Sequence, residues 1–188
     1  MTAATSEKVR WTIADLDGLP DNGNRYEIID GDLFVTRAPH LGHQDATGAV
    51  YAELRTWSLK SGLGKPFIGP GVIFSESDAV IPDVIWISHT RQAQLIDDAG
   101  HLTGPPELAI EVLSKTAKDK QRDREIKLKL YSVQGIAEYW ILDREQESVE
   151  VYRRENAQLK KAATLFSSDC LTSPLLPGFS CDVESLFK

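Results

Sequence analysis

The run AVIPDVIWIS, at residues 79–88, constrains the fold more than any other stretch, because it is apolar almost throughout yet contains Pro82 and Asp83. Its length and composition predict a buried strand. A proline removes a hydrogen bond from a strand ladder, and a buried carboxylate is costly unless it is paired, hydrogen-bonded or bound to a metal. We therefore predict an irregularity at Pro82 that directs Asp83 into a cleft. The alternative is a solvated aspartate at a frayed strand end.

The rest of the chain alternates strand and helix patterns. Asp30-Gly31 is a strong two-residue turn signal between two β-rich runs, so it predicts a hairpin over residues 25–37. A second long helix is expected from about Lys118 to Gln134, with Ser114 or Thr116 as its cap and Gly135 as its end. The other predicted elements are a short helix in 12–20, a long helix in 38–62, strands in 65–74, 79–88 and 106–114, a mobile polar excursion in 89–105, a meander in 137–165, and an edge segment with a short helix in 174–188.

This order predicts an α/β (α+β) fold, in which one central mixed β-sheet is flanked by helices. A chain of 188 residues suits a single domain, 1–188, with its core at about 24–155. No apolar run approaches the roughly 20 residues that span a bilayer, and residues 1–20 lack the apolar centre of a secretory signal. Cys170 and Cys181 form no metal-ligand pattern, so a reducing, cytoplasmic setting without membrane contact is expected.

The formal net charge is −7, whereas proteins that track nucleic-acid backbone without sequence preference are usually basic. The charge therefore argues against tight bulk binding of DNA. One local exception exists, because residues 114–131 contain seven Lys or Arg and three acids, which gives +4. This run is either a solvated helix face or a surface that faces DNA.

Charged residues in apolar surroundings are the candidates for chemistry. Asp83 and Glu111 lie in two apolar runs, Glu27 lies in RYEIID, and Lys127 lies on the second long helix. Two carboxylates on separate strands predict a shared partner, and a hard cation such as Mg²⁺ or Mn²⁺ prefers their oxygen atoms. A lysine beside such a site can stabilise charge on phosphate oxygens or orient the attacking water. The set therefore favours phosphodiester hydrolysis.

Several motifs resemble those of a known family. Proline-aspartate in one strand and an acid in the next resembles the PD-(D/E)xK nuclease superfamily, although Leu113 stands where that motif has lysine. A narrower match is the Uma-two family of restriction-endonuclease-like proteins, on the hairpin Tyr26-Glu27…Asp30-Gly31 and on His43. Its other motifs are present as Glu111-Val112-Leu113-Ser114, Asp123, Lys127, Tyr131, Gly135, Glu138-Tyr139-Trp140 and Asp143.

The resemblance covers about residues 12–187 and implies a restriction-endonuclease-like fold with an Asp/Glu/Lys site. It implies Asp83 and Glu111 as metal ligands with the Val112 carbonyl as a third, and Lys127 in the role of the displaced lysine. It further implies Glu27 as an additional acid of the site. His43 is expected to contact phosphate or substrate. The expected partners are nucleic acid, most simply DNA, and a second copy of the chain, for which the apolar tail 174–187 is one interface.

Other readings of these residues stay open. Glu111 and Lys127 could form a buried salt bridge without metal, or Lys127 could pair with Asp123 one helical turn away. Glu27 could lie on a solvent face, and His43 could be a surface or packing residue. Tyr131 and Trp140 are expected in the core. For the whole protein, the rivals to an endonuclease are a catalytically silent binding or scaffold protein with a nuclease fold and a hydrolase of small phosphoesters.

Overall fold

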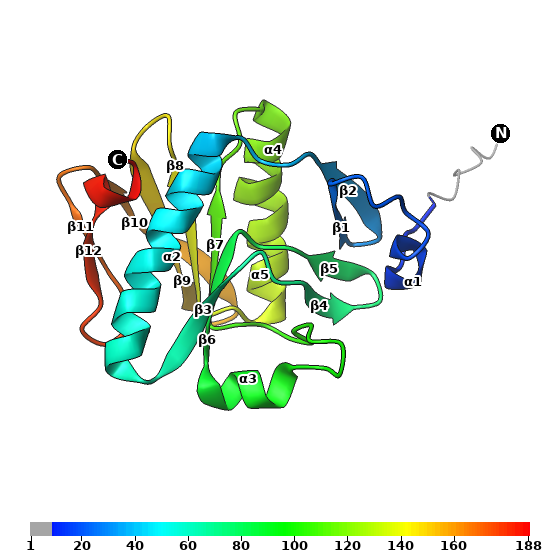
Figure 1. Ribbon diagram of the computed structural model, residues 1–188, viewed down its shortest axis with the longest axis horizontal. Helices are drawn as coiled ribbons and strands as arrows, with labels where there is room; N and C mark the ends of the chain where they lie inside the picture. The colour runs from blue at the N-terminus through cyan, green and yellow to red at the C-terminus, as the bar shows by residue number, and fades with distance from the viewer. Residues whose placement is uncertain (1–8) are drawn as a thin grey trace.

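The structure, a computed structural model, describes residues 9–188 and contains two main sheets with a long helix between them (Figure 1). Residues 1–8 lie outside the described residues. Two predictions extend over them, namely the single domain 1–188 and the absence of a secretory signal in residues 1–20. The predicted short first helix is present as α1, Ile13–Leu16. Across residues 9–188, no helix has the length and apolar character needed to cross a membrane.

The larger sheet is mixed, as predicted, and has six strands in the order β10-β9-β8-β7-β6-β3. Only β7 and β8 are parallel to each other, and the other neighbours in this sheet run antiparallel. A parallel pair needs a long crossover, and the second long helix supplies it. In chain order the strands are β3 (Gly64–Ile68), β6 (Val84–Ser88), β7 (Leu108–Val112), β8 (Glu138–Asp143), β9 (Ser148–Glu155) and β10 (Gln158–Phe166).

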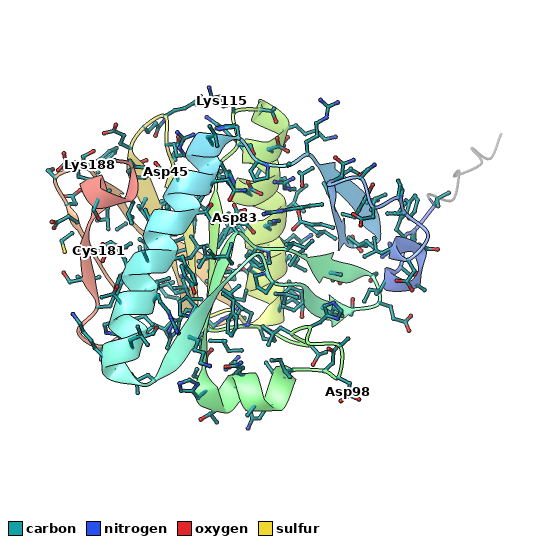
Figure 2. The ribbon with its side chains drawn as sticks, in the orientation of Figure 1. Asp45, Asp83, Asp98, Lys115, Cys181 and Lys188 are labelled. Atoms are coloured by element: carbon teal, nitrogen blue, oxygen red, sulfur yellow. The ribbon has the colours of Figure 1, made fainter. Side chains whose placement is uncertain are left out.

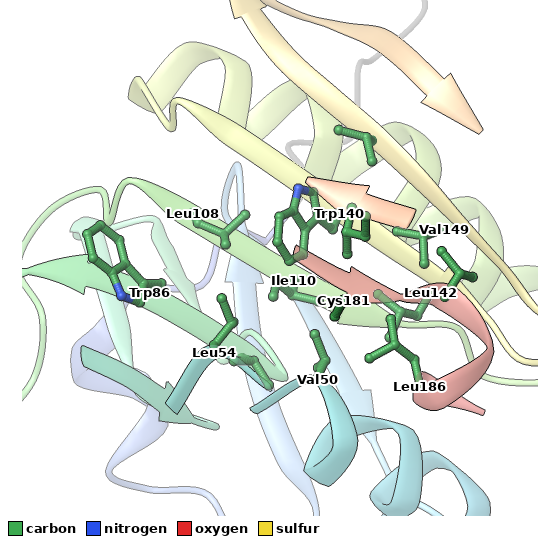
Figure 3. Close-up of a cluster of buried hydrophobic side chains, with 14 of the residues drawn as sticks. Val50, Leu54, Trp86, Leu108, Ile110, Trp140, Leu142, Val149, Cys181 and Leu186 are labelled. Carbon is green, nitrogen blue, oxygen red and sulfur yellow. The ribbon is translucent and has the colours of Figure 1, made fainter. Parts of the chain in front are cut away.

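Both faces of this sheet are buried, because successive side chains along a strand point to opposite sides. Trp86, Ile110 and Trp140 belong to the face that packs against helix α2, Leu41–Ser61, through Val50 and other side chains (Figure 3). Alternate strand residues, including Ile85, Ala109 and Ile141, belong to a second apolar cluster on the other face. Glu111 therefore points to the second face, where the long crossover helix packs.

A smaller antiparallel sheet holds the predicted hairpin, with the order β2-β1-β5-β4. The prediction of one sheet was therefore wrong, because the runs 65–74 and 79–88 each divide into two strands that belong to different sheets. The division falls where Pro82 cannot donate a ladder hydrogen bond and where Gly69 has a φ of 58°, although Gly69 N–H still donates to Asp83 O at 3.0 Å. The four strands are β1 (Arg25–Ile29), β2 (Asp32–Thr36), β4 (Val72–Ser75) and β5 (Asp78–Val80).

The crossover helix lies between the two sheets. It begins as α4 (Ala117–Gln121), continues through the π-helical turn η1 (Arg122–Lys127) and ends as α5 (Leu128–Gln134), which agrees with the predicted span. Thr116 caps its start, and Gly135 ends it with a φ of 91°. Leu130 and Tyr131 share an apolar cluster with residues of both sheets. The π turn was not predicted.

Two further predictions need correction. The polar excursion 89–105 contains a helix, α3 (His89–Leu95), whose first turn is capped by the Ser88 hydroxyl, which accepts from Arg91 N–H at 3.2 Å. The tail is not an exposed apolar surface, because its apolar side chains, among them Phe179 and Val183, are buried in the core beside α2. It forms strand β12 (Ser180–Asp182), which pairs with β11 (Cys170–Thr172), and then the predicted short helix η2 (Val183–Leu186). Cys170 and Cys181 are free.

Candidate functional site

Asp83 and Glu111 lie opposite each other on neighbouring strands. The register pairs Val84 with Ile110, and continuing this antiparallel ladder by one residue sets Asp83 across from Glu111. Directly opposed residues carry their side chains on the same face, with Cβ atoms about 5 Å apart. The predicted pair of carboxylates is thus adjacent, and both side chains are buried, with exposed fractions of 4% and 3%. The solvated reading of Asp83 is wrong.

Asp83 lies just before β6, near the centre of the molecule (Figure 2), where three neighbouring groups stabilise its charged form. Arg25 Nη1 donates to Oδ1 at 2.9 Å, while Val112 N–H donates to Oδ2 at 2.9 Å and His43 Nε2 lies 3.1 Å from Oδ2. Burial alone would raise the pKa of Asp83, but the bonds from His43 and Val112 outweigh burial and lower the pKa. Asp83 is therefore an ionised group.

Lys127 joins the two sheets through their carboxylates. Its Nζ lies 2.8 Å from Glu27 Oε1 of the small sheet and 2.8 Å from Glu111 Oε1 of the large sheet. The Ile81 N–H holds the same Glu27 oxygen at 2.8 Å, and Tyr131 donates its hydroxyl to Glu111 Oε1 at 2.9 Å. Burial alone would lower the pKa of Lys127, but the surrounding acids raise it, so this buried lysine is charged.

Glu27 reaches the crossover helix because alternate residues of β1 share one face. Arg25, Glu27 and Ile29 point the same way, toward Asp83, Lys127 and the apolar cluster respectively. Glu27 is 3% exposed, so the alternative that it lies on a solvent face is wrong. Tyr131 is buried as predicted, but its hydroxyl belongs to the site.

Glu111 differs from Asp83 in its proton affinity. Burial raises its pKa to about 8, and although Lys127 opposes this shift, the neighbouring acids Asp83, Asp123 and Glu27 add to it. One lysine thus serves two carboxylates. Because Lys127 and Tyr131 both bond Oε1, Glu111 Oε2 receives no hydrogen bond from the described residues.

The π turn brings three of its charged residues into the buried part of the site. Arg122, Asp123 and Lys127 are all buried, at 8%, 1% and 1% exposure. Asp123 accepts from Arg122 Nε at 3.0 Å, so the alternative pairing of Lys127 with Asp123 is replaced by pairs with Glu27 and Glu111. π turns occur frequently at functional sites, since they change which residues of a helix share a face.

Lys127, Glu27, Glu111, Asp83 and Arg122 line a narrow cleft of about 40 Å³ that opens to solvent. Its wall includes the predicted residues of the site, and also residues that the sequence did not single out, namely Arg25, Thr36, Arg37, Pro39, Ile81 and Arg122. The buried charges of the cleft are already paired with one another, whereas Arg37 in its lining is exposed. The arrangement can hold an anion beside two carboxylates and one buried ammonium.

The donor set fits a hard divalent cation. Mg²⁺ is commonly bound by one or two carboxylates and keeps several waters, so Asp83, Glu111 and the Val112 carbonyl are a chemically suitable set. Glu111 Oε2 is a carboxylate oxygen left for such a ligand. No group of three or more His, Cys, Asp or Glu side chains suited to a metal occurs within residues 9–188, so a cation here would depend on backbone and water for its other ligands.

The basic run 114–131 is mostly paired in the fold. Lys120 pairs with Glu145, Arg122 with Asp123, and Lys127 with two glutamates. Arg124 pairs with Asp143 and Glu150. The run is therefore not a free basic surface, and what remains of it lies at Lys115, Lys118 and Lys129.

Comparison with known proteins agrees with the geometry. A family model described as "Uma2: Putative restriction endonuclease" matches residues 13–184. The chain belongs to the Uma2 family. No curated protein matches it. Among solved structures, one from Anabaena variabilis ATCC 29413, described as a putative nuclease belonging to DUF820, is 16% identical, with a TM-score of 0.75 over 94% of this chain and 97% of the other. The fold of this Uma2 protein is restriction-endonuclease-like.

Proposed function

We propose that this protein is a metal-dependent endonuclease that hydrolyses phosphodiester bonds of nucleic acid, with DNA as the expected substrate and Mg²⁺ or Mn²⁺ as cofactor. The observation that carries the proposal is the position of Lys127 Nζ, 2.8 Å from Glu111 Oε1, with Glu111 and Asp83 each adjacent in sequence to the pair Val84–Ile110 that ends the β6–β7 ladder. An acid pair can hold a metal ion that activates a water, and a buried ammonium can stabilise charge on a phosphate oxygen.

Each residue receives a role from its contacts. Asp83, Glu111 and the Val112 carbonyl would hold the cation, which would polarise the phosphate and activate a water when bound. Lys127 would donate to a phosphate oxygen and stabilise the charge that develops there. Glu27, itself fixed by the Ile81 N–H, would keep the ammonium oriented.

His43 keeps its predicted role as a phosphate contact within this proposal. Its Nε2 lies 3.1 Å from Asp83 Oδ2, and its ring is 6% exposed in the wall of the cleft. A group in this position can bond either the carboxylate or an incoming phosphate oxygen, since both are acceptors.

The second candidate is a nuclease-fold binding or scaffold protein without turnover. Two observations favour it, namely that the buried charges of the cleft pair with one another and that the net charge is −7. Against it stands the raised pKa of Glu111, because a scaffold gains nothing from an acid that its surroundings make hard to ionise.

A homodimer remains part of the proposal, because a second copy would allow two strands to be cut. The tail cannot supply the interface through its buried apolar side chains, so another surface has to serve.

The test combines isothermal titration of Mg²⁺ and Mn²⁺ with nicking of plasmid DNA. We expect wild type to bind metal and nick DNA, Glu111→Gln to lose both, and the exposed-site control Glu184→Gln to keep both. Metal binding without cleavage of DNA or RNA would favour the scaffold. Unchanged metal binding in Glu111→Gln would contradict the site.

A further inference from the structure

We propose that Arg37 holds a backbone phosphate that flanks the scissile one, so that the cleft takes a nucleic-acid strand and not a small phosphoester. This inference rests on the proposed function and names the kind of substrate. It starts from the charges that line the cleft and from what each of them already contacts.

Three of the four Lys and Arg side chains that line the cleft are occupied. Lys127 is held by two glutamates, Arg122 Nε bonds Asp123 at 3.0 Å, and Arg25 Nη1 bonds Asp83 at 2.9 Å. Within residues 9–188, no carboxylate pairs with Arg37. It is thus the lining cation whose guanidinium is available to an incoming anion.

Arg37 lies at the solvent edge of the cleft. It directly follows β2, whose last residue, Thr36, pairs with Arg25 of β1, and it begins the connection from β2 to α2 (Figure 1). Arg37 is exposed, whereas Asp83 and Glu111 on the floor are 4% and 3% exposed. A group bound by the floor carboxylates therefore sits deeper than a group bound by Arg37.

A second exposed cation follows a residue that lines the cleft. Ser114 lines it, and the next residue in the chain, Lys115, is exposed near the start of α4 (Figure 2). Arg37 and Lys115 thus add exposed positive charge to a site whose acids are buried. Exposed charge of this sign attracts a polyanion locally even though the whole chain is acidic.

The difference in depth between Arg37 and the buried carboxylates distinguishes a nucleic-acid strand from a small phosphoester. A small phosphoester has one phosphate, which the floor would engage, and gains nothing from a second cation at the rim. A strand has a phosphate on each neighbouring nucleotide, and the planar fork of an arginine matches the geometry of phosphate oxygens. An unpaired arginine at the rim is therefore useful only to a substrate with more than one phosphate.

The experiment measures binding and turnover separately. Affinity for a fluorescein-labelled oligonucleotide is measured by anisotropy in Ca²⁺, over a range of salt, for wild type, Arg37→Ala and Arg37→Lys. The matched control is Arg55→Ala, which removes the same charge from the part of α2 that lines a different pocket. Hydrolysis of bis(4-nitrophenyl) phosphate with Mn²⁺ reports on the floor alone.

We expect Arg37→Ala to weaken binding about tenfold, as for one lost charge-assisted hydrogen bond, and to reduce the slope of log K against log salt by about 1. Arg37→Lys should keep the slope, because it keeps the charge. Arg55→Ala should bind like wild type. Hydrolysis of the small diester should fall much less in Arg37→Ala than the affinity for the oligonucleotide does, because this substrate has no second phosphate.

Two results would overturn the inference. Equal affinity and slope in Arg37→Ala and wild type would remove Arg37 from the substrate contact while leaving the nuclease proposal standing. Hydrolysis of the small diester by a wild type that binds no oligonucleotide would assign the cleft to small phosphoesters. Binding that depends on Arg37 without any cleavage would instead support the contact and count against the nuclease.

Discussion

Glu111 on β7 and Glu150 on β9 lie in the same row of the large sheet, with β8 between them, because the register pairs both of them with Ile141. Each accepts from a tyrosine hydroxyl, at 2.9 Å for Glu111 and 2.7 Å for Glu150, and each pairs with a cation of the π turn. Yet the pKa of Glu111 is raised to about 8, whereas the pKa of Glu150 is lowered.

Burial and the surrounding charge together explain the difference. Burial raises the pKa of both groups, and Glu111 is the more buried of the two, but Glu150 is also paired with two cations, Lys161 and the Arg124 that it shares with Asp143, at 2.8 Å each. Glu111 shares its one lysine with Glu27 and has further acids nearby. Similar hydrogen-bond partners thus accompany opposite pKa shifts, and the excess of acid around Glu111 is the place where one more cation would be stabilising.

The largest expected effect comes from removing the shared lysine. Lys127→Met leaves Glu27 and Glu111 buried without their cation, so we expect a loss of about 3–5 kcal/mol in the free energy of unfolding. Arg124→Met leaves Glu150 with Lys161, and because Arg124 is 30% exposed we expect a loss of only about 1 kcal/mol. Urea denaturation followed by circular dichroism measures both. Equal losses would refute the asymmetry between the two glutamates.

The next effect is a pH dependence of stability in a metal chelator. Between pH 4.5 and about 8, folded Glu111 keeps a proton that the unfolded chain has lost. The stability of wild type should therefore fall as pH rises through this window, by at most about 1.4 kcal/mol for each pH unit.

Glu111→Gln cannot lose a proton, so its unfolding free energy should lack this slope. Urea midpoints at several pH values between 5 and 8 give the comparison, with Glu184→Gln as the exposed control. A wild type whose stability rises through the window would contradict the raised pKa.

The smallest expected effect has the opposite sign. Because the folded pKa of Glu150 is lowered, this group stabilises the fold above its unfolded pKa of about 4.5, and the contribution is lost as pH falls through the folded value. Glu150→Gln should cost about 1 kcal/mol or less at pH 7, since its cations are partly exposed, and the cost should vanish in acid. The same urea series detects it, and a cost that grows toward low pH would be the contrary outcome.

Much of the site could be predicted because its members stand out in the sequence. Asp83 and Glu111 are carboxylates in apolar runs, which a fold tolerates only with partners, and the four-residue spacing of Asp123, Lys127 and Tyr131 indicates one helical face. These residues do lie together. Arg25 and Arg37 could not be found this way, because an arginine at a strand end in polar surroundings is ordinary.

The parts of the fold that were missed leave no periodic pattern. None of the seven residues of helix α3 is buried, so its sequence lacks the apolar periodicity from which a helix is predicted. The strands of the two sheets have similar compositions. Only Pro82 and the glycines around Pro70 indicate that each run passes from one sheet to the other. The π turn could not be predicted either, because a four-residue spacing of site residues fits an ordinary α-helix as well.

The π turn also has a consequence for how this gene tolerates small deletions. A π turn holds one residue more than the α-helical turn it replaces, and each residue of an α-helix turns the chain by about 100°. Loss of a single codon within Arg122–Lys127 would allow an ordinary helix of nearly the same length and composition. Either Arg122 or Lys127 would then point away from the cleft. A one-residue deletion that removes none of the residues of the site would therefore still disrupt it.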